Sequence, residues 1–297
     1  MNNPSIDDVN GRHALKYSKI KVPGKFQINR PIVNLVLFIL TIISTFLTGY
    51  GMEGHILEGV WYSSGIISIL LAHEMGHYFM CRKYGIAVTL PFFIPLPFLS
   101  PFGTLGAVIK MESFIPSRKA LFDVAVAGPL AGLAFTIPAI YFGVQLSDIV
   151  EKSAVNSSGV IHLGESLLYQ FLSFCAIGSL SETKELMLHP LAFAGWAGLF
   201  VTALNLLPIG QLDGGHIIYA LVGKHHRVIA ITGIACMLAV ALFWFRGWIP
   251  LLLLLLWFGI QHPPTMDERP VGRFRVALGI ITLIVFALSF TPKPLQL

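Results

Sequence analysis

The chain has 297 residues, of which 55% are hydrophobic and 12% are charged, and its mean hydropathy is +0.75. A soluble domain of this length would be hard to keep in solution with so few charges, so the composition excludes that class and predicts an all-α polytopic membrane protein. The net charge of +5 comes from basic residues grouped at the ends of apolar runs, a pattern typical of membrane orientation and not of nucleic-acid binding. The three cysteines, Cys81, Cys175 and Cys236, lie far apart and predict neither a disulfide framework nor a thiolate metal site.

The N-terminal part divides into a polar tail and a first apolar run. Residues 1–29 are polar and mostly basic, and we expect them to form a cytosolic tail. The run from Pro31 to Tyr50 is about 20 residues long, which is enough to span a membrane, and no signal-peptide cleavage pattern follows it. Residues 30–59 are therefore expected to hold the first transmembrane helix and a short loop.

The second apolar run, from Val60 to Met80, contains His73, Glu74 and His77 and ends beside cations that mark its cytosolic end. Residues four apart share one face of a helix, so the two histidines can offer imidazole nitrogens to one metal ion. Glu74 is rotated to the side, where its carboxylate can act as a general base toward a water molecule at the metal. A chance match to this spacing is the alternative. However, three ionisable groups at membrane depth are costly to bury unless a metal compensates for them.

Residues 86–111 are as apolar as a membrane span but contain four prolines, Pro91, Pro95, Pro97 and Pro101. Prolines at this density exclude a regular helix, and irregular backbone in lipid is tolerated only where protein or a water-filled cavity satisfies its polar groups. The alternation in GTLGAVIKM favours a short strand. We interpret the segment as re-entrant and β-like, folded against the histidine helix from the cytosolic side; a loop on the membrane surface is the alternative.

A third span is predicted for Ala120 to Gln145, and its small residues favour close helix packing. Asp123 near its start is expected to be solvated or to support other groups rather than to bind a metal. Residues 146–188 are poor in cations, which predicts an extracytosolic loop. The middle of this loop, LGESLLYQFLSFCAIG, is expected to form at most an amphipathic or interfacial helix.

The fourth apolar run, residues 189–223, is interrupted by Pro208 and crowds polar groups around the break. One of them, Asp213, is costly at membrane depth without a partner, and the metal held by the two histidines is the best available one. Asp213 would then be the third protein ligand and water the fourth, as in an open catalytic site. The glycines that follow, Gly214 and Gly215, would let the backbone come close to that site.

Two motifs together resemble the site-2 protease family of intramembrane zinc metalloproteases: HEMGH at residues 73–77 and NLLPIGQLDGG at residues 205–215. The likeness covers a core from about residue 60 to 222 and is nearest to the branch shared by bacteria and chloroplasts. We expect neither the PDZ insertion nor the CBS pair that some members carry. The resemblance implies Zn²⁺ as cofactor, with the roles assigned to five residues: zinc ligands His73, His77 and Asp213, catalytic base Glu74, and substrate-binding or oxyanion-stabilising Asn205.

Residues 223–297 are expected to hold the C-terminal transmembrane helices. These are a fifth span to Phe245, a short apolar run at 247–260 that is either a sixth span or part of a bent helix, and a last span from Phe274 to Phe290. This arrangement gives about seven spans, with most cations on the cytosolic side. The roles of three histidines in this part stay open: His225, His226 and His262.

The resemblance implies an integral, multi-pass enzyme that cleaves transmembrane helices of membrane-tethered proteins, as in regulated intramembrane proteolysis. Its active site would lie nearer the cytosolic face, and we expect a bacterial inner membrane. The expected partners are a transmembrane protein substrate and membrane lipids, and no nucleic acid. The substrate, the cleaved bond, the upstream protease and the oligomeric state stay open.

Two other functions are kept as alternatives. A zinc transporter could also place His, Glu and Asp on facing helices, but it needs ligands across the whole bilayer, whereas the polar groups of this chain gather at one depth. A catalytically inactive relative that binds membrane helices is the second alternative, and the absence of zinc from the purified protein would favour it.

Overall fold

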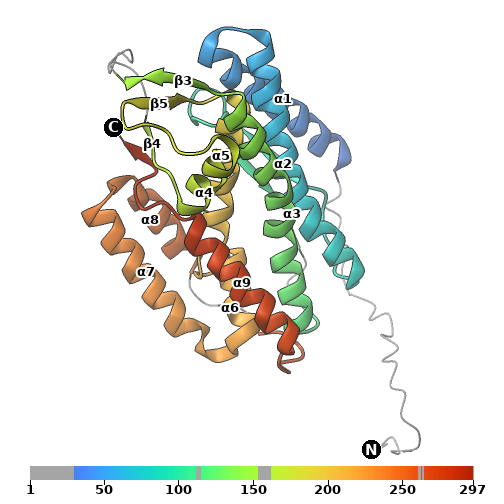
Figure 1. Ribbon diagram of the computed structural model, residues 1–297. Coiled ribbons are helices and arrows are strands. Elements are labelled where there is room, and N and C mark those ends of the chain that lie inside the picture. Colours follow the sequence, from blue (N-terminus) through green and yellow to red (C-terminus); the bar gives the residue numbers. More distant parts are fainter. Residues whose placement is uncertain (1–29, 112–114, 153–161, 260–261, 263, 297) are drawn as a thin grey trace, which may run out of the picture.

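The computed structural model describes residues 30–111, 115–152, 162–259, 262 and 264–296 and is mostly helical (Figure 1). The expected basic tail, residues 1–29, lies outside the described residues. The α-helices are α1 (Pro31–Glu53), α2 (Ile56–Lys83), α3 (Arg118–Gln145), α4 (Leu167–Ile177), α5 (Pro190–Asn205), α6 (Asp213–Val222), α7 (His226–Phe243), α8 (Ile249–Phe258) and α9 (Arg273–Ser289).

Short strands form antiparallel pairs between the helices. The strands are β1 (Phe92–Pro95), β2 (Thr104–Val108), β3 (Asp148–Glu151), β4 (His162–Leu163), β5 (Lys184–Met187) and β6 (Leu295–Gln296). In the described residues β1 pairs with β2, β3 with β5, and β4 with β6. The fold is therefore mostly helical, as expected, with short antiparallel strand pairs, one of which lies in the proline-rich segment expected to be β-like.

Four stretches of the described chain are long and apolar enough to cross a membrane: Pro31–Met52, Ile56–Lys83, Arg118–Gln145 and Asp213–Phe243. This supports a membrane protein, whereas the expected number of about seven spans is not confirmed. The remaining apolar runs form shorter helices: α5 has 16 residues and α8 has 10. At 1.5 Å per residue, 16 residues cover about 24 Å, less than the roughly 30 Å of a hydrocarbon core.

Pro208 divides the fourth apolar run, as predicted. Helix α5 ends at Asn205, and α6 begins at Asp213 after a tight connection. Proline has no backbone N–H and disfavours a helical residue before it, so a helix breaks readily at this point, although α3 continues through Pro129 and Pro138. The break makes Asp213 the first residue of a new helix, with its side chain at the positive end of the helix dipole.

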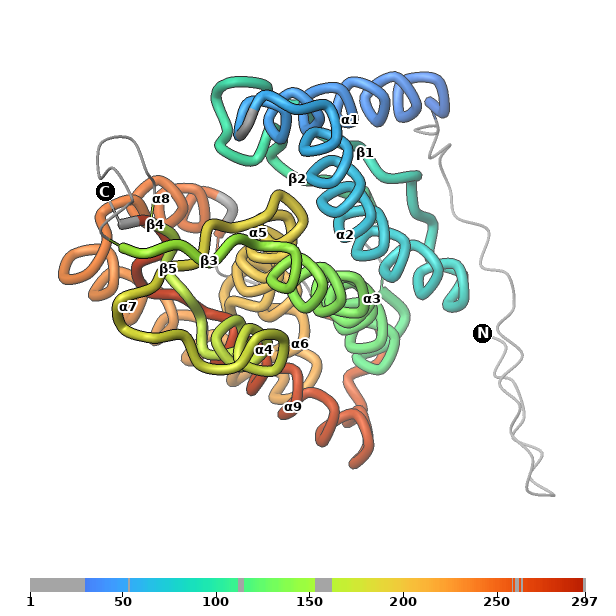
Figure 2. Tube along the Cα trace, turned by 45° about the horizontal axis from the view of Figure 1, so that its top comes forward, coloured from blue at the N-terminus to red at the C-terminus, as the bar shows by residue number. Residues whose placement is uncertain are grey.

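Helices α2, α3 and α5 pack together at the centre of the molecule. Their facing side chains form a buried cluster that includes Ile66, Leu70, Ile140 and Leu199. The approach is close because small residues lie at the contacts: a Cβ added to Gly195 would lie 2.7 Å from Ile140 Cγ1. Figures 1 and 2 place α1 and the β1–β2 hairpin on one side of these helices, and α7 and α8 on the other.

The proline-rich segment forms a β-hairpin, which confirms the strand predicted within it. Phe92 pairs with Val108 and Phe93 with Ala107, and the register then shifts before Pro95. The hairpin tip carries apolar side chains that are almost fully exposed, with Phe98 at 90% and Leu99 at 83%.

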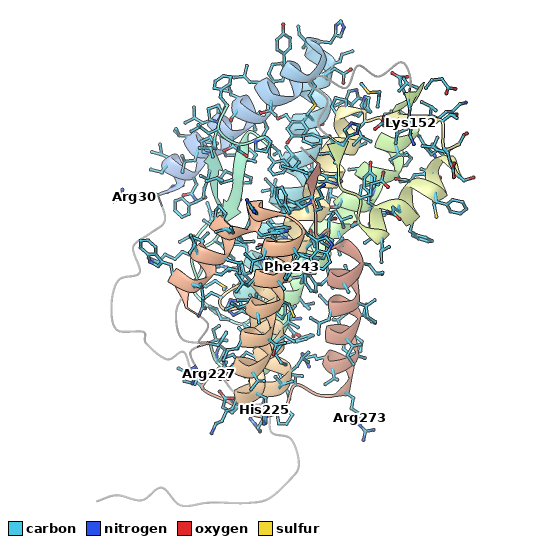
Figure 3. All side chains as sticks on the ribbon, turned by 90° about the vertical axis from the view of Figure 1, so that its left-hand side faces the viewer. Arg30, Lys152, His225, Arg227, Phe243 and Arg273 are labelled. Atoms are coloured by element: carbon cyan, nitrogen blue, oxygen red, sulfur yellow. The ribbon has the colours of Figure 1, made fainter. Side chains whose placement is uncertain are left out.

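Polar loops gather at two opposite ends of the molecule. Figure 3 shows His225, Arg227 and Arg273 at one end, near the 3₁₀ turn Gly223–His225 that joins α6 to α7. Lys152 lies at the other end, where β3, β5 and α4 form most of the described part of residues 146–188. Helix α4 confirms the short helix expected in that segment. The antiparallel pairing of β3 with β5 is not predicted by the sequence.

The C-terminal part folds back onto the central helices. Between α7 and α8 the chain makes a 3₁₀ turn at Arg246–Trp248, so residues 228–260 hold two helices in their described part and not one. Helix α9 is tied to α3 because Arg275 donates from Nε and Nη2 to Asp123, at 2.7 and 2.8 Å. Tyr84 also donates to Asp123, so this carboxylate belongs to a structural ion pair.

Candidate metal centre and active site

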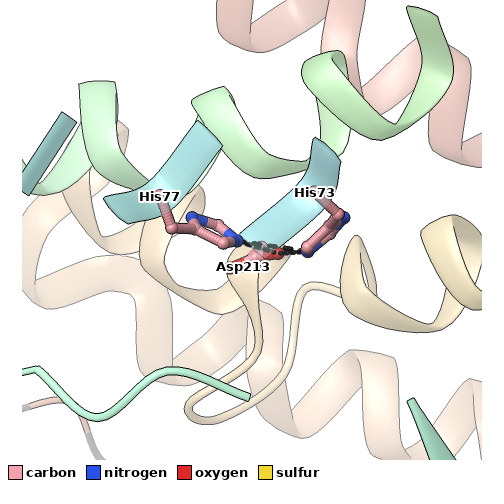
Figure 4. A group of neighbouring side chains, drawn as sticks. All are labelled: His73, His77 and Asp213. Atoms are coloured by element: carbon pink, nitrogen blue, oxygen red, sulfur yellow. Dashed lines mark hydrogen bonds and ion pairs between the residues drawn. The ribbon is translucent and has the colours of Figure 1, made fainter. Parts of the chain in front are cut away.

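His73 and His77 lie one turn apart on α2, and their rings converge on Asp213 (Figure 4). Their Nε2 atoms are 3.1 Å apart, and both side chains are buried, with 5% and 6% of each residue exposed. The helix forms here because a long apolar run surrounds the two histidines. Its periodicity, and not a special loop, sets their spacing.

Asp213 meets both histidines from α6. Its Oδ2 atom lies 3.3 Å from Nε2 of His73 and 3.3 Å from Nε2 of His77. The three possible ligand atoms lie within 4.8 Å of one another, and no other group of three such residues is found in the described chain. Two segments that are distant in the sequence thus converge at one point inside the helix bundle.

The spacing of these three atoms fits a tetrahedral metal ion. An ion held about 2.0–2.2 Å from each ligand places neighbouring ligand atoms roughly 3.3 Å apart or slightly more. The observed separations of 3.1 and 3.3 Å are close to this edge length. Two imidazoles and one carboxylate also leave a fourth position open, which is the donor set of a catalytic site.

A backbone carbonyl of α3 orients His77. Its Nδ1 atom lies 2.8 Å from the carbonyl oxygen of Val124 and donates its hydrogen there. In the neutral ring this leaves the Nε2 lone pair directed at Asp213 and His73, as a metal ligand requires.

Two glycines of α3 make room for the imidazole rings. A Cβ at Gly128 would overlap the His77 ring, and one at Gly132 would lie 3.4 Å from Nδ1 of His73. The small residues of α3 were interpreted as helix packing, and they do pack closely, but against the histidines of the site. The signal in the sequence is the spacing of the two glycines. They lie four residues apart, like the two histidines, so they share one face of their helix.

Glu74 is next to the ligand group but outside it. Only 7% of the residue is exposed, and its carboxylate faces the backbone of Ile109, the residue that directly follows β2. A buried carboxylate beside a metal site is suited to taking and returning a proton.

Asn205, the last residue of α5, also reaches the site. Its Nδ2 atom donates toward Nε2 of His73 at 3.3 Å. The structure therefore brings together all five residues singled out in the sequence: His73, Glu74, His77, Asn205 and Asp213.

The two glycines after Asp213 allow close backbone approach. A Cβ at Gly214 would collide with the carbonyl oxygen of Leu206, and one at Gly215 with that of Gly210. They let the connection between α5 and α6 fold back onto the first turn of α6, so they shape the loop that carries Asp213.

A second group of histidines lies beside the site. His216 Nδ1 is 2.7 Å from Nε2 of His262, and the His262 ring stacks on Tyr219 with 4.2 Å between ring centroids. His262 is 8% exposed, so it is not a solvated loop residue. His226 packs edge-on against Tyr219, whereas His225 is exposed. No residue spacing along the chain indicates this group, because its members come from three separate segments.

Comparison with known families decides the identity of the scaffold. The family model described as peptidase family M50 matches residues 61–245, which include all five site residues. The chain belongs to peptidase family M50, the site-2 protease family. This confirms the resemblance inferred from the two motifs.

Several M50 relatives are plant proteins. "Probable zinc metalloprotease EGY1, chloroplastic" of Arabidopsis thaliana is 32% identical over 235 residues, which cover 77% of this chain and 42% of that protein. "Probable zinc metalloprotease EGY2, chloroplastic" of the same plant is 30% identical, covering 76% of this chain and 40% of its own. The chain thus spans less than half the length of these curated relatives. No solved structure matches it.

Proposed function

We propose that this protein is an integral-membrane zinc endopeptidase that cleaves transmembrane helices of other membrane proteins. The observation that carries the proposal is the convergence of His73, His77 and Asp213 beside the buried Glu74, inside a bundle of apolar helices. The M50 match and the names of the relatives, which describe probable zinc metalloproteases, support the same activity.

His73, His77 and Asp213 are the residues that would hold the zinc ion. When bound, zinc would acidify water and polarise the scissile carbonyl group as a Lewis acid. Glu74 takes a proton from the attacking water and delivers it to the leaving amine. Its burial between α2 and the end of β2 keeps bulk water away from this carboxylate and strengthens its local electrostatic effect.

Asn205 is proposed to bind the substrate at the reacting carbonyl. Its amide lies 3.3 Å from the metal-binding nitrogen of His73, so a carbonyl oxygen held at the centre is within its reach. A donor at that place stabilises the negative charge that develops on the oxygen.

The β1–β2 hairpin is proposed to be re-entrant and to hold the substrate in extended form. A transmembrane helix hides its peptide groups in its own hydrogen bonds, so it must unwind before cleavage. In the described residues β2 pairs with β1 alone, and its other edge can accept an added strand. The hairpin carbonyl groups are bonded by side chains of α1 and α2, which lets irregular backbone lie at membrane depth.

The site is proposed to lie nearer the cytosolic face. Positively charged loops favour that side, and His225, Arg227 and Arg273 mark the end of the molecule toward which α2 runs from His73. The functional core is proposed to be residues 60–222, between an N-terminal unit, residues 1–59, and the C-terminal helices of residues 223–297. The expected bacterial inner membrane finds no support, because the relatives are named chloroplastic.

The proposal is tested with the Glu74→Gln variant in liposomes that contain a labelled transmembrane test substrate. We expect this variant to keep its zinc and to lose cleavage, because glutamine preserves the shape but cannot take a proton. Glu58→Gln, on the first turn of the same helix and far from the site, is the matched control and should cleave normally. Cleavage by Glu74→Gln would refute the assigned base.

The same preparations discriminate the two alternatives. Zinc uptake into vesicles that survives Glu74→Gln would favour a transporter, although the described residues offer one ligand group and not a chain of them. A protein that binds the substrate helix, carries no zinc and cleaves nothing would be an inactive helix-binding relative.

A further inference from the structure

The first arm of the β1–β2 hairpin is held by a single amide of α1. Asn34 donates from Nδ2 to the carbonyl oxygens of Leu90, at 3.0 Å, and Pro91, at 2.8 Å. Asn34 is 6% exposed although most of the surrounding surface of α1 is apolar and open. A buried amide is retained in such a helix where it satisfies groups that would otherwise be unpaired, and here it satisfies two carbonyls that no strand partner reaches.

The second arm is held in the same manner. The Ser44 hydroxyl of α1 donates to the carbonyl oxygen of Gly103 at 2.5 Å, and the Tyr62 hydroxyl of α2 donates to that of Phe102 at 3.0 Å. Gly103 has a φ of +70°, and a Cβ at this position would collide with the Thr48 hydroxyl. Each arm of the hairpin is therefore bonded separately to the neighbouring helices. These bonds limit how far the hairpin can slide along α1 and α2.

β2 connects this attachment to the catalytic base. Beyond its last residue, Val108, the backbone of Ile109 lies beside the Glu74 carboxylate. A strand advances about 3.4 Å per residue, and a slip of one residue turns every side chain to the opposite face. Slips of two residues, roughly 7 Å, preserve the faces and would bring a different part of the strand edge to Glu74.

We propose that Asn34 is a positioning residue that fixes the register of β2 and thereby selects which peptide bond of an extended substrate reaches Glu74. This inference rests on the proposed function and adds a determinant of cleavage position to it. Asn34 does not touch the site: it acts through the backbone of residues 90 and 91, the strand pairing and Ile109.

The test is the Asn34→Leu variant, which keeps the side-chain volume but removes both donors. Products of a transmembrane test substrate are identified by mass spectrometry. We expect a second product, cut two residues from the principal site, in a yield comparable to the first, with zinc content unchanged. Ser44→Ala should act in the same direction because it releases the other arm. Thr41→Val is the matched control: Thr41 is also buried on α1 but donates within the helix, to Leu37.

A second measurement does not depend on catalysis. In the Glu74→Gln background, Leu105→Cys places a thiol on the exposed side of β2, with Cys175 and Cys236 replaced by serine. A series of single-cysteine substrates then reports the register by disulfide cross-linking. We expect one preferred substrate position with Asn34 intact and several with Asn34→Leu.

The outcomes separate this inference from the proposed function. One preferred cross-link and one cleavage product in both the intact protein and Asn34→Leu would overturn the register assignment and leave the peptidase standing. If the intact protein fails to cut any test substrate, the proposed function fails, whereas a cross-linking pattern that broadens in Asn34→Leu would still support a register set by α1.

Discussion

Gly128 of α3 lies directly against the imidazole ring of His77, so that no methyl group fits between them. The ring is also held from its other nitrogen by the Val124 carbonyl, so it cannot turn aside without losing that bond. The orientation of this proposed metal ligand thus depends on a helix that contributes no residue to the ligand group.

We expect Gly128→Ala to lose most of its zinc, because the added methyl group displaces the His77 ring from the ligand position. Gly132→Ala is the graded control, since a Cβ there meets His73 at 3.4 Å, close to ordinary van der Waals contact. Zinc per protein, measured by atomic emission after purification, checks both. Equal zinc in the two variants would show that α3 moves away from α2 at low cost.

Asn205→Ala is expected to keep zinc and to lower kcat by about 10²- to 10³-fold, as the loss of one donor to a developing oxyanion does in other hydrolases. Its amide lies 3.3 Å from Nε2 of His73, within reach of an oxygen held beside that nitrogen. Single-turnover kinetics with a transmembrane test substrate distinguishes a slower chemical step from weaker substrate binding. A rise in KM with an unchanged kcat would mean that Asn205 holds the substrate only before the reaction.

We expect the ion pair between Asp123 and Arg275 to stabilise the packing of α9 against α3. Both groups are partly buried, with 17% and 29% of their side chains exposed, so removing one partner leaves a charge poorly solvated. We expect Arg275→Leu to destabilise the protein by about 1–3 kcal/mol, and the double variant with Asp123→Asn to lose less than the two single losses combined. Thermal unfolding in detergent checks this, and simple additivity would argue against the coupling.

The linker before α9 should loosen in acid. Burial tends to raise the pKa of Glu268, but hydrogen bonds from Tyr219 and Thr265 outweigh it, and the pKa lies below the ordinary value of 4.5. A carboxylate whose pKa is lower in the folded protein than in the unfolded chain stabilises the fold at pH values above its unfolded pKa. This contribution is lost as the pH falls through the pKa of the folded protein. We expect faster hydrogen exchange in the linker around residues 264–269 below about pH 4.5, with little pH dependence over this window in Glu268→Gln.

The sequence predicted the parts of the site that depend on local rules. Helical spacing placed His73 and His77 on one face, and Pro208 ended a helix shortly before Asp213. These are properties of the backbone within a few residues, so they can be read without the fold. The prolines of residues 86–111 likewise excluded a helix and left strands.

The parts that depend on packing could not be predicted. Nothing local shows that Val124 offers its carbonyl to His77, or that Arg275 reaches Asp123. The expected number of spans is not confirmed for a related reason, because hydropathy does not distinguish a full membrane crossing from a short apolar helix such as α8.

The break at Pro208 also has a consequence for how the enzyme is made. Because Asp213 opens α6 while the two histidines belong to α2, a chain that is still being synthesised carries both imidazoles for a long interval without their carboxylate partner. Since segments emerge from the N-terminus first, the cage can close only after α5 and α6 have been inserted. Under the proposed function, a half-made polypeptide therefore lacks one of the three ligands and cannot yet cut the proteins that share its membrane.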